Sequence, residues 1–409
     1  MTERVLPFES ALAEVLSHAG SRAVEVDAIE AVELLDGVGR VLAAAVVADR
    51  DQPPFDRATR DGYAVRAGDV GSALRVVGSV RAGESWRGAS LGEGEAIEIM
   101  TGAPLPDGAD AVVMVEHAAV VDGMLRVEVG RSLRGGENVV SRGAEVRAGS
   151  VVLPRGRVLG AAEIAVAASC GLAEVQVFAR PKVAIVATGD ELVELDEAME
   201  AWQIRNSNSY ALAALVRGEG GVAVRLPVAR DTLEDLRERI AEGRAAELLL
   251  LSGGVSMGKY DLVEQVLRDA GAEFFFTGAL IQPGKPIVFG RLAKESGWTY
   301  FFGLPGNPVS TQVCFHLFVA PMLRALAGRM EIAPRFVEAR LAEEVKGGAR
   351  VTRFLPAVLG GGWDGVSVRV VGWQGSGDVA ANARGNCYYV LPSGVEEFKA
   401  GETVRVLLR

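Results

Sequence analysis

The hydrophobic and polar positions in the middle of the chain, residues 181–326, repeat in the order strand, loop, helix. Short apolar runs at 183–187 and 248–251 predict buried strands, because they are too short for buried helices and are followed by glycines. Segments 208–217 and 232–242 carry apolar residues at helical spacing and begin with residues that can cap a helix. This alternation predicts a mostly parallel sheet with helices on both faces.

Runs of β-branched residues flank this region on both sides. Between residues 63 and 129, short runs separated by glycine and aspartate turns predict a small barrel or sandwich. The runs are 74–77, 96–99, 111–115 and 125–129. After about residue 334 the pattern predicts a second, separate β domain. Its expected strands are 337–341, 353–359, 366–371, 388–391 and 404–408.

The N-terminal part has weaker patterns. Residues 8–19 carry apolar side chains at helical spacing and predict a short amphipathic helix. Residues 21–47 are expected to be helix-rich or mixed. The alanine-rich stretch 159–172 predicts a helix that ends at Gly171. The chain as a whole is therefore predicted to be a multidomain protein with α/β and β parts.

The composition narrows the classes of function. A length of 409 residues suggests roughly two to four domains. With 49% hydrophobic residues, the chain can form sizeable cores. A net charge of −10 without a long basic run argues against general nucleic-acid binding. An acidic protein that binds phosphates needs a metal ion or local lysines to offset the repulsion.

The cysteines and histidines disfavour several other kinds of site. The three cysteines, Cys170, Cys314 and Cys387, lie far apart and predict buried thiols in a reducing compartment, not disulfide bonds or a zinc site. The three histidines are equally scattered, which disfavours a histidine-based metal site or triad. The N-terminus lacks a signal pattern, and no apolar run is long enough to span a bilayer. We therefore expect a soluble cytoplasmic protein.

The most informative stretch is 248–261. Its apolar strand is broken by Ser252-Gly253-Gly254, where glycines allow a sharp turn and offer backbone N–H groups to an anion. Asp261 then stands at the expected start of a helix. A strand, a glycine turn and a helix N-terminus form a phosphate cradle at the edge where open α/β sheets bind ligands. The alternative is a tight turn followed by an ordinary helix cap.

A carboxylate follows several strands of the α/β region. Glu191 follows the first strand, Asp231 the second and Asp261 the strand at 248–251. Because loops after parallel strands converge at one sheet edge, these acids would repel one another unless a hard cation binds. Mg²⁺ prefers oxygen ligands and shares them with substrate phosphates. Alternatively, each acid caps a helix, Asp231 most plainly.

Other loops also offer groups that bind anions. Lys285 lies between two prolines, which can pre-position its ammonium group or simply form a surface turn. The loop 305–308 opens a helix and can cradle an anion in the same way. Thr101 can bind a phosphate or a metal-bound water, or form a structural turn. The charged loop 49–64 and the arginine-rich stretch 131–157 either face a substrate or are solvated connections.

Six short motifs occur in order along the chain. They are Asp61-Gly62-Tyr63-Ala64, Thr101-Gly102-Ala103-Pro104, Thr188-Gly189-Asp190-Glu191-Leu192, Ser252-Gly253-Gly254-Val255-Ser256, Pro283-Gly284-Lys285-Pro286 and Gly303-Leu304-Pro305-Gly306-Asn307-Pro308-Val309-Ser310. Each motif alone is weak, but the ordered set is highly specific. On these motifs the chain resembles, over nearly its whole length, the bacterial molybdopterin molybdenumtransferases of the MoeA type, which are related to the C-terminal part of gephyrin.

The resemblance implies a fold and a reaction. It implies a central α/β/α sheet domain of the molybdopterin-binding type, a small β domain inserted near the N-terminus and a barrel-like C-terminal β domain, in an elongated homodimer. The implied ranges are 1–48 with 130–178 for a discontinuous linker and dimer domain, 49–129 for the inserted domain, 179–328 for the α/β domain and 329–409 for the C-terminal domain. The implied reaction is Mg²⁺-dependent insertion of molybdate into adenylylated molybdopterin, with release of AMP. Transient contacts with the molybdopterin adenylyltransferase and with apo-molybdoenzymes are expected.

The implied site lies between the α/β domain of one subunit and the β-rich region of the other. The residues assigned to catalysis are Asp61, Thr101, Glu191, Asp231 and Asp261, of which the last three are the expected metal ligands. The residues assigned to substrate binding are Thr188, Ser252, Gly253, Gly254, Ser256, Lys285, Pro305, Pro308, Arg353 and Ser376. Two positions depart from the family: Gln282 stands where many relatives have lysine, and Glu145 where some have aspartate.

Two other functions compete with this interpretation. The α/β domain alone resembles the enzymes that adenylylate molybdopterin, which would consume ATP instead of molybdate. The flanking regions 1–178 and 329–409 favour the transferase. A scaffold of the gephyrin kind is the second alternative, but the acidic residues are retained and no long linker is present. No activated Ser, Cys or His nucleophile is evident, so the expected mechanism is positioning with metal-assisted cleavage of the phosphoanhydride.

Overall fold

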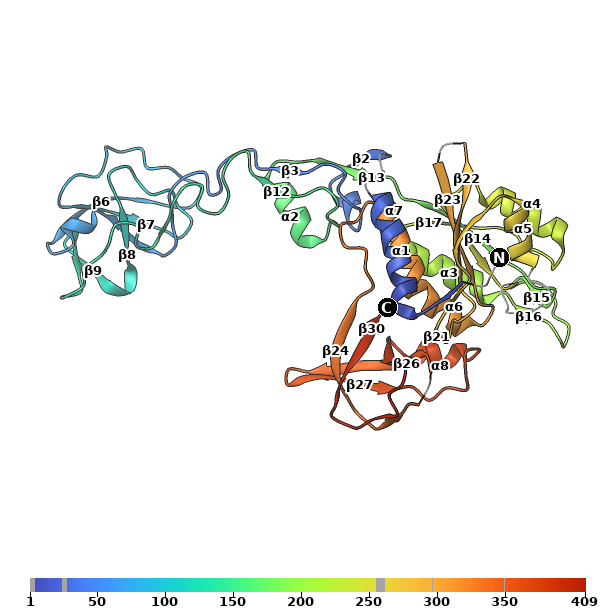
Figure 1. Cartoon of the computed structure of the whole chain (residues 1–409). Coiled ribbons are helices and arrows are strands. Elements are labelled where there is room, and N and C mark those ends of the chain that lie inside the picture. The colour runs from blue at the N-terminus through green and yellow to red at the C-terminus, as the bar shows by residue number, and fades with distance from the viewer. Residues whose placement is uncertain (1–3, 24–27, 255–261, 296, 349) are drawn as a thin grey trace.

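The computed structural model describes residues 4–23, 28–254, 262–295, 297–348 and 350–409 of the chain. The molecule is elongated (Figure 1). A small β domain lies at one end of a narrow connection, and a larger body with a sheet, its helices and a barrel lies at the other end. The predicted site residues Asp61 and Thr101 therefore lie in the small β domain, far from the other described site residues in the larger body.

The body is built on a sheet whose strand order, among the described residues, is β17-β14-β18-β23-β22-β19. These strands are β14 (Lys182–Ala187), β17 (Val222–Arg225), β18 (Leu248–Ser252), β19 (Glu273–Phe276), β22 (Val288–Lys294) and β23 (Gly297–Leu304). The first four in the sheet order pair in parallel, and β22 runs antiparallel to both of its neighbours. The prediction of a mostly parallel sheet is confirmed. The sequence pattern did not indicate β19.

Helices cover both faces of the sheet because alternate strand residues point to opposite sides. Leu248 and Leu250 point into one core, and Leu249 and Leu251 point into the other. All four leucines are fully buried, as expected for a strand covered on both faces. The first core also contains α1 (Phe8–Ala23), α3 (Ser207–Gly218), α6 (Pro308–Cys314) and α7 (Ala320–Leu326). The second contains α4 (Leu233–Gly243) and α5 (Leu262–Asp269).

Helices α6 and α7 are joined by a π-helical turn, η4 (Phe315–Val319), into one segment. This segment, Pro308–Leu326, has 19 residues and a mean hydropathy of 1.3, so it is long and apolar enough to cross a membrane. The prediction that no apolar run reaches that length is therefore wrong. Within the protein, 89% of the most apolar 18-residue stretch of this segment is buried. It is apolar all round because the sheet, α1 and the barrel surround it, which is the environment of a core helix.

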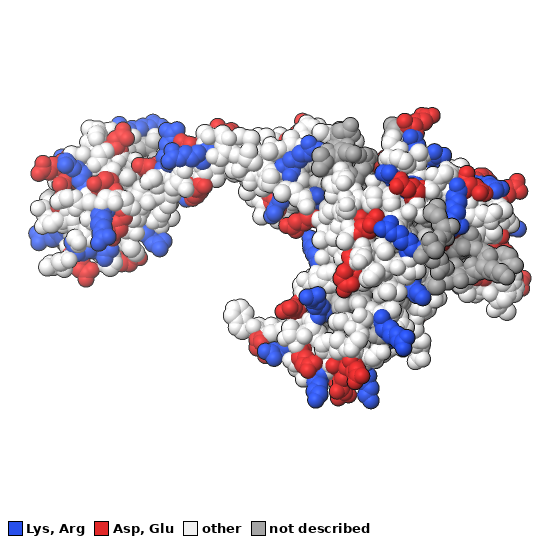
Figure 2. Space-filling view, viewed as in Figure 1, with Lys and Arg blue, Asp and Glu red and all other residues white. Residues whose placement is uncertain are grey.

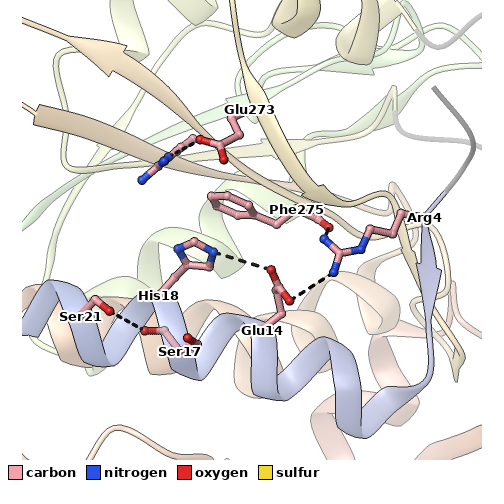
Figure 3. Close-up of polar contacts among 8 residues, drawn as sticks. Arg4, Glu14, Ser17, His18, Ser21, Glu273 and Phe275 are labelled. Carbon is pink, nitrogen blue, oxygen red and sulfur yellow. Dashed lines mark hydrogen bonds and ion pairs between the residues drawn. The ribbon is translucent and has the colours of Figure 1, made fainter.

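Polar contacts attach the N-terminal helix α1 to the edge of the sheet (Figure 3). Arg4 Nη1 donates a 2.6 Å hydrogen bond to the carbonyl of Phe275, and Arg4 Nη2 donates to Glu14 at 3.4 Å. His18 stacks on the Phe275 ring, with ring centroids 3.8 Å apart. Just before α1, β1 (Val5–Leu6) pairs in parallel with β20 (Gly278–Ala279). These contacts hold α1 on the body, close to the strand that leads into the Lys285 loop.

The C-terminal part of the described chain forms a closed barrel of five strands. Their order is β26-β27-β24-β30-β28, and β28 pairs back with β26 to close the ring. The strands are β24 (Phe336–Leu341), β26 (Thr352–Gly362), β27 (Gly365–Val370), β28 (Cys387–Leu391) and β30 (Thr403–Leu408). From the body, β21 (Ile281–Gln282) adds in parallel to β26 and places Gln282 beside Arg353. The predicted fold class, α/β plus β with a barrel-like C-terminal domain, is confirmed.

Short secondary elements complete the barrel and the narrow connection. The barrel region also contains β25 (Val345–Lys346), α8 (Val379–Arg384) and β29 (Glu397–Phe398). The connection pairs β2 (Ile29–Glu33) with β13 (Glu174–Phe178), β3 (Val46–Val47) with β12 (Val151–Leu153), and β4 (Arg57–Ala58) with β11 (Val139–Val140). The predicted helix at 159–172 is α2 (Ala161–Ser169). After α1, the described part of 21–47 contains strands and the 3₁₀ turn η1 (Leu35–Gly37), so it is mixed and not helix-rich.

The distant β domain is a sheet with the order β8-β5-β7-β6-β10-β9 among the described residues. Its strands are β5 (Gly62–Val65), β6 (Leu74–Val80), β7 (Glu95–Ile99), β8 (Ala111–Met114), β9 (Ala118–Val121) and β10 (Met124–Val127), with 3₁₀ turns η2 (Ala67–Asp69) and η3 (Val115–His117). The sequence predicts a loop over 49–64, but Gly62 already belongs to β5. A Cβ atom on Gly62 would lie 1.8 Å from the carbonyl oxygen of Val113. The glycine therefore permits close strand pairing.

Candidate functional site

A cleft lies where the parallel strands β14, β18 and β23 end. Its cavity has a volume of about 640 Å³, within the range of roughly 300–1,000 Å³ that is typical of small-molecule sites. The lining includes Thr188, Glu191, Asp231, Ser252, Gly253, Gly254, Pro305 and Pro308 from the predicted set. It also includes Gly377 and Val379, so the barrel region supplies part of the wall. The structure thus brings eight of the predicted site residues into one cleft.

The glycine turn after β18 is closely packed against the neighbouring loop. Gly253 has a φ of +96° and Gly254 a φ of +64°, both in the left-handed region. A Cβ atom on Gly253 would lie 2.4 Å from the carbonyl oxygen of Thr188, and one on Gly254 would lie 2.6 Å from Val263 Cγ2. Both positions therefore require glycine. This packing holds the loops after β14 and β18 at a fixed separation.

Asp231 is oriented by its neighbours. Its Oδ1 accepts a 2.6 Å hydrogen bond from the hydroxyl of Thr188, which is only 4% exposed. Its backbone N–H donates to Asp190 Oδ1 at 3.2 Å. The sequence offered helix capping as the plainest alternative role for Asp231, but the N-cap of α4 is Thr232, whose side chain accepts from the N–H of Asp235. The capping explanation for Asp231 is therefore wrong.

Glu191 is the second acidic residue in the cleft. Its carboxylate folds back on its own loop. A Cβ atom placed on Gly189 would lie only 2.6 Å from Glu191 Oε2. Glu191 and Asp231 both line the cavity, as expected for acids that follow parallel strands. Asp261 and Ser256 lie outside the described residues. Within the described ranges, no group of three Asp, Glu, His or Cys residues is close enough to hold a metal ion.

Ser252 is tied to a residue that the sequence analysis did not select. Asn208 Nδ2 donates to Ser252 Oγ at 3.0 Å and to the carbonyl of Gly306 at 2.7 Å. Asn208 lies in the first turn of α3, whose N-cap is the buried Asn206. One amide thereby joins the ends of β18 and β23. From the sequence, this region predicts only the start of a helix at residue 208, and the signal for a polar lining is the pair of amides at 206 and 208.

The barrel contacts the opening of α6. The N–H of Val309 donates a 2.9 Å hydrogen bond to the carbonyl oxygen of Ser376. Pro308 occupies the first turn of α6, and the hydroxyl of Thr311 donates to the carbonyl of Pro305 at 2.6 Å. Ser376 thus contacts the site through its backbone, while the neighbouring residues Gly377 and Val379 line the cavity.

Lys285 and Arg353 are not part of the cleft lining. Lys285 is exposed, and the next residue, Pro286, lines the cavity. The buried Cys314 thiol supports the loop that carries Lys285, because it donates to the carbonyl of Gly284 at 3.6 Å. Burial raises the pKa of that thiol, so it stays protonated. Arg353 Nε is buried and has no hydrogen-bond partner among the described residues.

Asp61 and Thr101 form a compact pair in the distant β domain. Asp61 Oδ1 accepts hydrogen bonds from the backbone N–H of Thr101 at 2.6 Å and from its hydroxyl at 2.7 Å. These bonds hold the pKa of Asp61 below its ordinary value. Both side chains are exposed. The β domain stands well away from the body in Figure 1, so one chain does not bring Asp61 to its own cleft.

The arginine-rich stretch 131–157 forms ion pairs with acids of its own chain. Arg142 Nε lies 2.8 Å from Asp51, and Arg157 Nη2 lies 2.7 Å from Glu163. Glu145 pairs with Arg57 at 3.1 Å. On the face shown in Figure 2, the described acidic and basic side chains are interspersed over the β domain and the body. These pairs favour a structural connection over a substrate-facing segment.

Three comparisons with protein families cover most of the chain. Residues 6–171 match the MoeA N-terminal region (domain I and II). Residues 184–325 match a probable molybdopterin binding domain. Residues 338–408 match the MoeA C-terminal region (domain IV).

Individual relatives and solved structures agree with these matches. The molybdopterin molybdenumtransferase of Staphylococcus aureus (strain Mu50) is 33% identical over 411 residues, covering 98% of this chain and 95% of that protein. The protein of the same name from Nostoc sp. is 35% identical over 395 residues, covering 92% of this chain and 88% of that protein. A crystal structure of a molybdopterin biosynthesis MoeA protein from Pyrococcus horikoshii has a TM-score of 0.75 at 34% identity and covers 99% of both chains. A second structure from that organism has a TM-score of 0.80 at 29% identity and covers 99% of this chain and 100% of the other.

Proposed function

The chain belongs to the MoeA family of molybdopterin molybdenumtransferases, which places it in molybdenum cofactor biosynthesis, and we propose that it inserts molybdate into adenylylated molybdopterin with release of AMP. The observation that carries the proposal is the cleft at the ends of β14, β18 and β23, where two carboxylates face a glycine turn and the opening of α6. This arrangement suits a substrate that contains a phosphoanhydride and needs a cation beside it.

We propose Mg²⁺ as the cation, because the acidic residues of the cleft suit it. Glu191 and Asp231 supply carboxylate oxygens to the same cleft, and hard divalent ions prefer such ligands. Thr188 occupies only Oδ1 of Asp231, and Oδ2 accepts no hydrogen bond from the described residues. We propose Glu191 and Asp231 as ligands, with Asp261 as the third. When bound, the ion would polarise a phosphoryl oxygen and offset negative charge.

The other residues of the cleft are proposed to bind and orient the substrate. The left-handed turn at Gly253 and Gly254 brings backbone close to the cavity, where the N–H of Gly254 can approach an anion, whereas the N–H of Gly253 donates to the carbonyl of Leu304. Ser252 is held in one position by Asn208, so its hydroxyl is pre-organised. Lys285, which precedes the lining residue Pro286, and Arg353 are proposed to bind the molybdate oxyanion. Gln282, which lies next to Arg353, offers an amide where many relatives offer an ammonium group.

We propose a homodimer in which the β domain of one protomer closes the cleft of the other. Asp61 is exposed, ionised and rigidly held, yet it lies far from the cleft of its own chain. A partner's β domain over the cleft would bring Asp61 and Thr101 to the substrate and exclude water. We further expect the protein to act in the cytoplasm, with transient contacts to the molybdopterin adenylyltransferase and to apo-molybdoenzymes, and without nucleic-acid or membrane binding.

The decisive experiment measures AMP release from adenylylated molybdopterin with Mg²⁺, with and without molybdate. Wild type is expected to release AMP only with molybdate, and Asp61→Ala is expected to lose most of that activity. Glu93→Ala is a matched control, because it removes another exposed carboxylate from the same domain. Glu93 precedes β7, at the opposite end of that strand from Thr101, the partner of Asp61. Formation of the adenylylated species from ATP and molybdopterin would instead support an adenylyltransferase. Absence of both activities in an intact dimer would support a scaffold.

A further inference from the structure

The charged lining of the cleft contains one basic residue among the described positions, Arg205. The other charged lining residues are Glu191 and Asp231. The Arg205 side chain is exposed, and it forms no hydrogen bond or ion pair with a described residue. An anionic substrate that enters this cleft meets two carboxylates and one uncommitted guanidinium group. Arg205 is therefore placed to offset repulsion between the acidic lining and a phosphate group.

The backbone around Arg205 is fixed on both sides. Arg205 lies in β16 (Ile204–Arg205), which pairs in parallel with β15 (Leu192–Val193) and puts Arg205 opposite Val193. The N–H of Ile204 donates to the carbonyl of Glu191, and the N–H of Asn206 donates to that of Val193, each at 2.9 Å. The loop that carries Glu191 therefore also positions Arg205. The two side chains of opposite charge enter the cleft from neighbouring backbone segments.

A buried network supports this backbone from behind. Asn206 is 1% exposed and accepts the N–H of Ser209 at 3.2 Å as the N-cap of α3. Its Nδ2 donates to Glu194 Oε1 at 3.0 Å, and Arg225 Nη2 donates to Glu194 Oε2 at 2.7 Å. Burial opposes ionisation of Glu194, but these hydrogen bonds outweigh it and keep its pKa below the ordinary value. The network holds the residue next to Arg205 in place.

Arg225, a neighbouring arginine, differs from Arg205 because its side chain is fully engaged in contacts within the protein. It pairs with Glu194, donates to Ser209 Oγ at 3.1 Å and lies 3.5 Å from the ring centroid of Tyr210. Arg205 lies on β16, next to the strand β15 that Glu194 follows, and its side chain makes none of these contacts. A guanidinium group with free donors on a fixed backbone is suited to bidentate phosphate binding.

We propose that Arg205 is a substrate-binding residue that contacts a phosphate group of the nucleotide part of the substrate. The proposal rests on the proposed function, because it takes the ligand of this cleft to be a nucleotide-linked phosphoanhydride. Arg205 binds the phosphate as an arginine fork, on the side of the cleft that also carries Glu191. None of the six sequence motifs includes Arg205, because one ends at Leu192 and the next begins at Ser252.

The test uses the full-length protein and two probes, AMP and adenosine, in titration calorimetry with Mg²⁺. Arg205→Ala is expected to weaken AMP binding by roughly 10- to 100-fold, the effect of losing hydrogen bonds to a charged group. Adenosine, which lacks the phosphate, is expected to bind equally to both proteins. Arg205→Lys is expected to fall between them, because lysine keeps the charge and loses the fork. Arg217→Ala is the matched control, since Arg217 is an exposed arginine near the end of α3 that does not line the cleft.

Turnover separates failure of this inference from failure of the proposed function. Arg205→Ala is expected to raise KM in the AMP-release assay more than it lowers kcat. If wild type turns over and binds AMP, but Arg205→Ala has unchanged AMP affinity, the Arg205 contact is overturned and the function stands. Equal weakening of AMP and adenosine also overturns it, because that result indicates a distorted loop. If wild type neither binds AMP nor releases it, the proposed function is overturned and this inference falls with it.

Discussion

The hydroxyl of Thr188 donates a 2.6 Å hydrogen bond to Oδ1 of Asp231. Thr188 follows β14 and Asp231 follows the neighbouring strand β17, so this bond ties two strand ends at the edge of the sheet. Thr188 is buried and cannot exchange Asp231 for water without opening the loop. Asp231 is consequently presented to the cleft in one orientation. A support of this kind is typical of metal-ligating carboxylates.

Thr188→Val is expected to weaken Mg²⁺-dependent activity, because valine keeps the shape of threonine but cannot donate to Asp231. Loss of such a supporting hydrogen bond typically costs roughly 10–100-fold in metal affinity or activity. The measurement is AMP release as a function of Mg²⁺ concentration, where the half-saturating concentration should rise. Thr188→Ser restores the hydroxyl and should recover most of the activity. An unchanged Mg²⁺ dependence in Thr188→Val would remove Asp231 as a ligand that depends on Thr188.

Gly253→Ala is expected to destabilise the body much more than Gly271→Ala. Both glycines have positive φ, +96° and +81°, so both substitutions strain the backbone. Only at Gly253 would the new Cβ meet backbone, 2.4 Å from the carbonyl of Thr188, whereas nothing lies within 4 Å at Gly271. The expected difference is roughly 1–3 kcal/mol in the free energy of unfolding, the cost of forced overpacking. Thermal unfolding of the two variants measures it, and equal losses would show that the loop relaxes freely.

Thr101→Val is expected to raise the pKa of Asp61 toward its ordinary value. The backbone N–H and the hydroxyl of Thr101 both lower that pKa, and the substitution removes the second donor only. Because the folded-state pKa is depressed, the stabilising contribution is present above the unfolded pKa and is lost as pH falls through the folded one. NMR titration of the Asp61 carboxyl measures the shift. Identical titration curves for wild type and variant would show that the hydroxyl does not act on Asp61.

The sequence was sufficient for most of the regular elements of the body, because their apolar positions recur at the period of a strand or a helix. The leucines of β18 alternate between two cores and could be identified as a doubly covered strand from composition alone. The pattern missed the edge strand β19, whose Phe275 and Phe276 pack in the core that contains α1 and whose Phe274 packs against the other core. It also missed the start of β5, because Gly62 is required by close approach to Val113, a contact that sequence spacing does not reveal.

The candidate site was only partly predictable, because its geometry depends on which segments pair. Glu191 and Asp231 could be placed at one edge from strand order, but the capping role of Thr232 beside Asp231 needed the structure. The sequence pattern does not indicate Arg205 or Asn208 as site residues. Arg205 reaches the cleft through the β15–β16 pairing, and Asn208 reaches it through the start of α3. Lys285 and Arg353 were assigned to the site, yet they lie outside the cavity lining.

Glu219→Gln is expected to destabilise the body by roughly 2–3 kcal/mol, somewhat less than breaking a fully buried ion pair. Glu219 accepts from Arg324 at 2.6 Å and from Arg329 at 3.1 Å, which ties α3 to the end of α7. Burial disfavours its ionisation, but these arginines outweigh burial and hold its pKa below the ordinary value. Its contribution is therefore full above the unfolded pKa and is lost as pH falls through the folded one, so the difference from wild type should shrink in acid.

Thermal unfolding of wild type and Glu219→Gln at neutral and acidic pH tests this expectation. Glu242→Gln is the control, because it removes a more exposed pair with Arg239 on α4, which is worth about 0–1 kcal/mol. A Glu219→Gln variant as stable as this control would show that Arg324 and Arg329 find other partners.

Mixing two inactive variants tests the proposal that the active site is shared between protomers. In Asp61→Ala the cleft residues are intact, and in Asp231→Ala the β domain is intact. If a β domain closes the partner's cleft, a mixed dimer contains one site with both Asp61 and Asp231. Random reassociation of equal amounts gives half mixed dimers, so about one quarter of wild-type activity should return.

The same mixture distinguishes the alternative that each chain completes its own site. In that case no chain carries both aspartates, and activity stays at the level of the separate variants. Asp61→Ala reassociated with itself controls for gain of activity through the treatment alone. Recovery should also depend on exchange between dimers, so mixing without dissociation should restore little. The result bears directly on the geometry, because Asp61 is held rigidly by Thr101 in a domain that stands away from its own cleft.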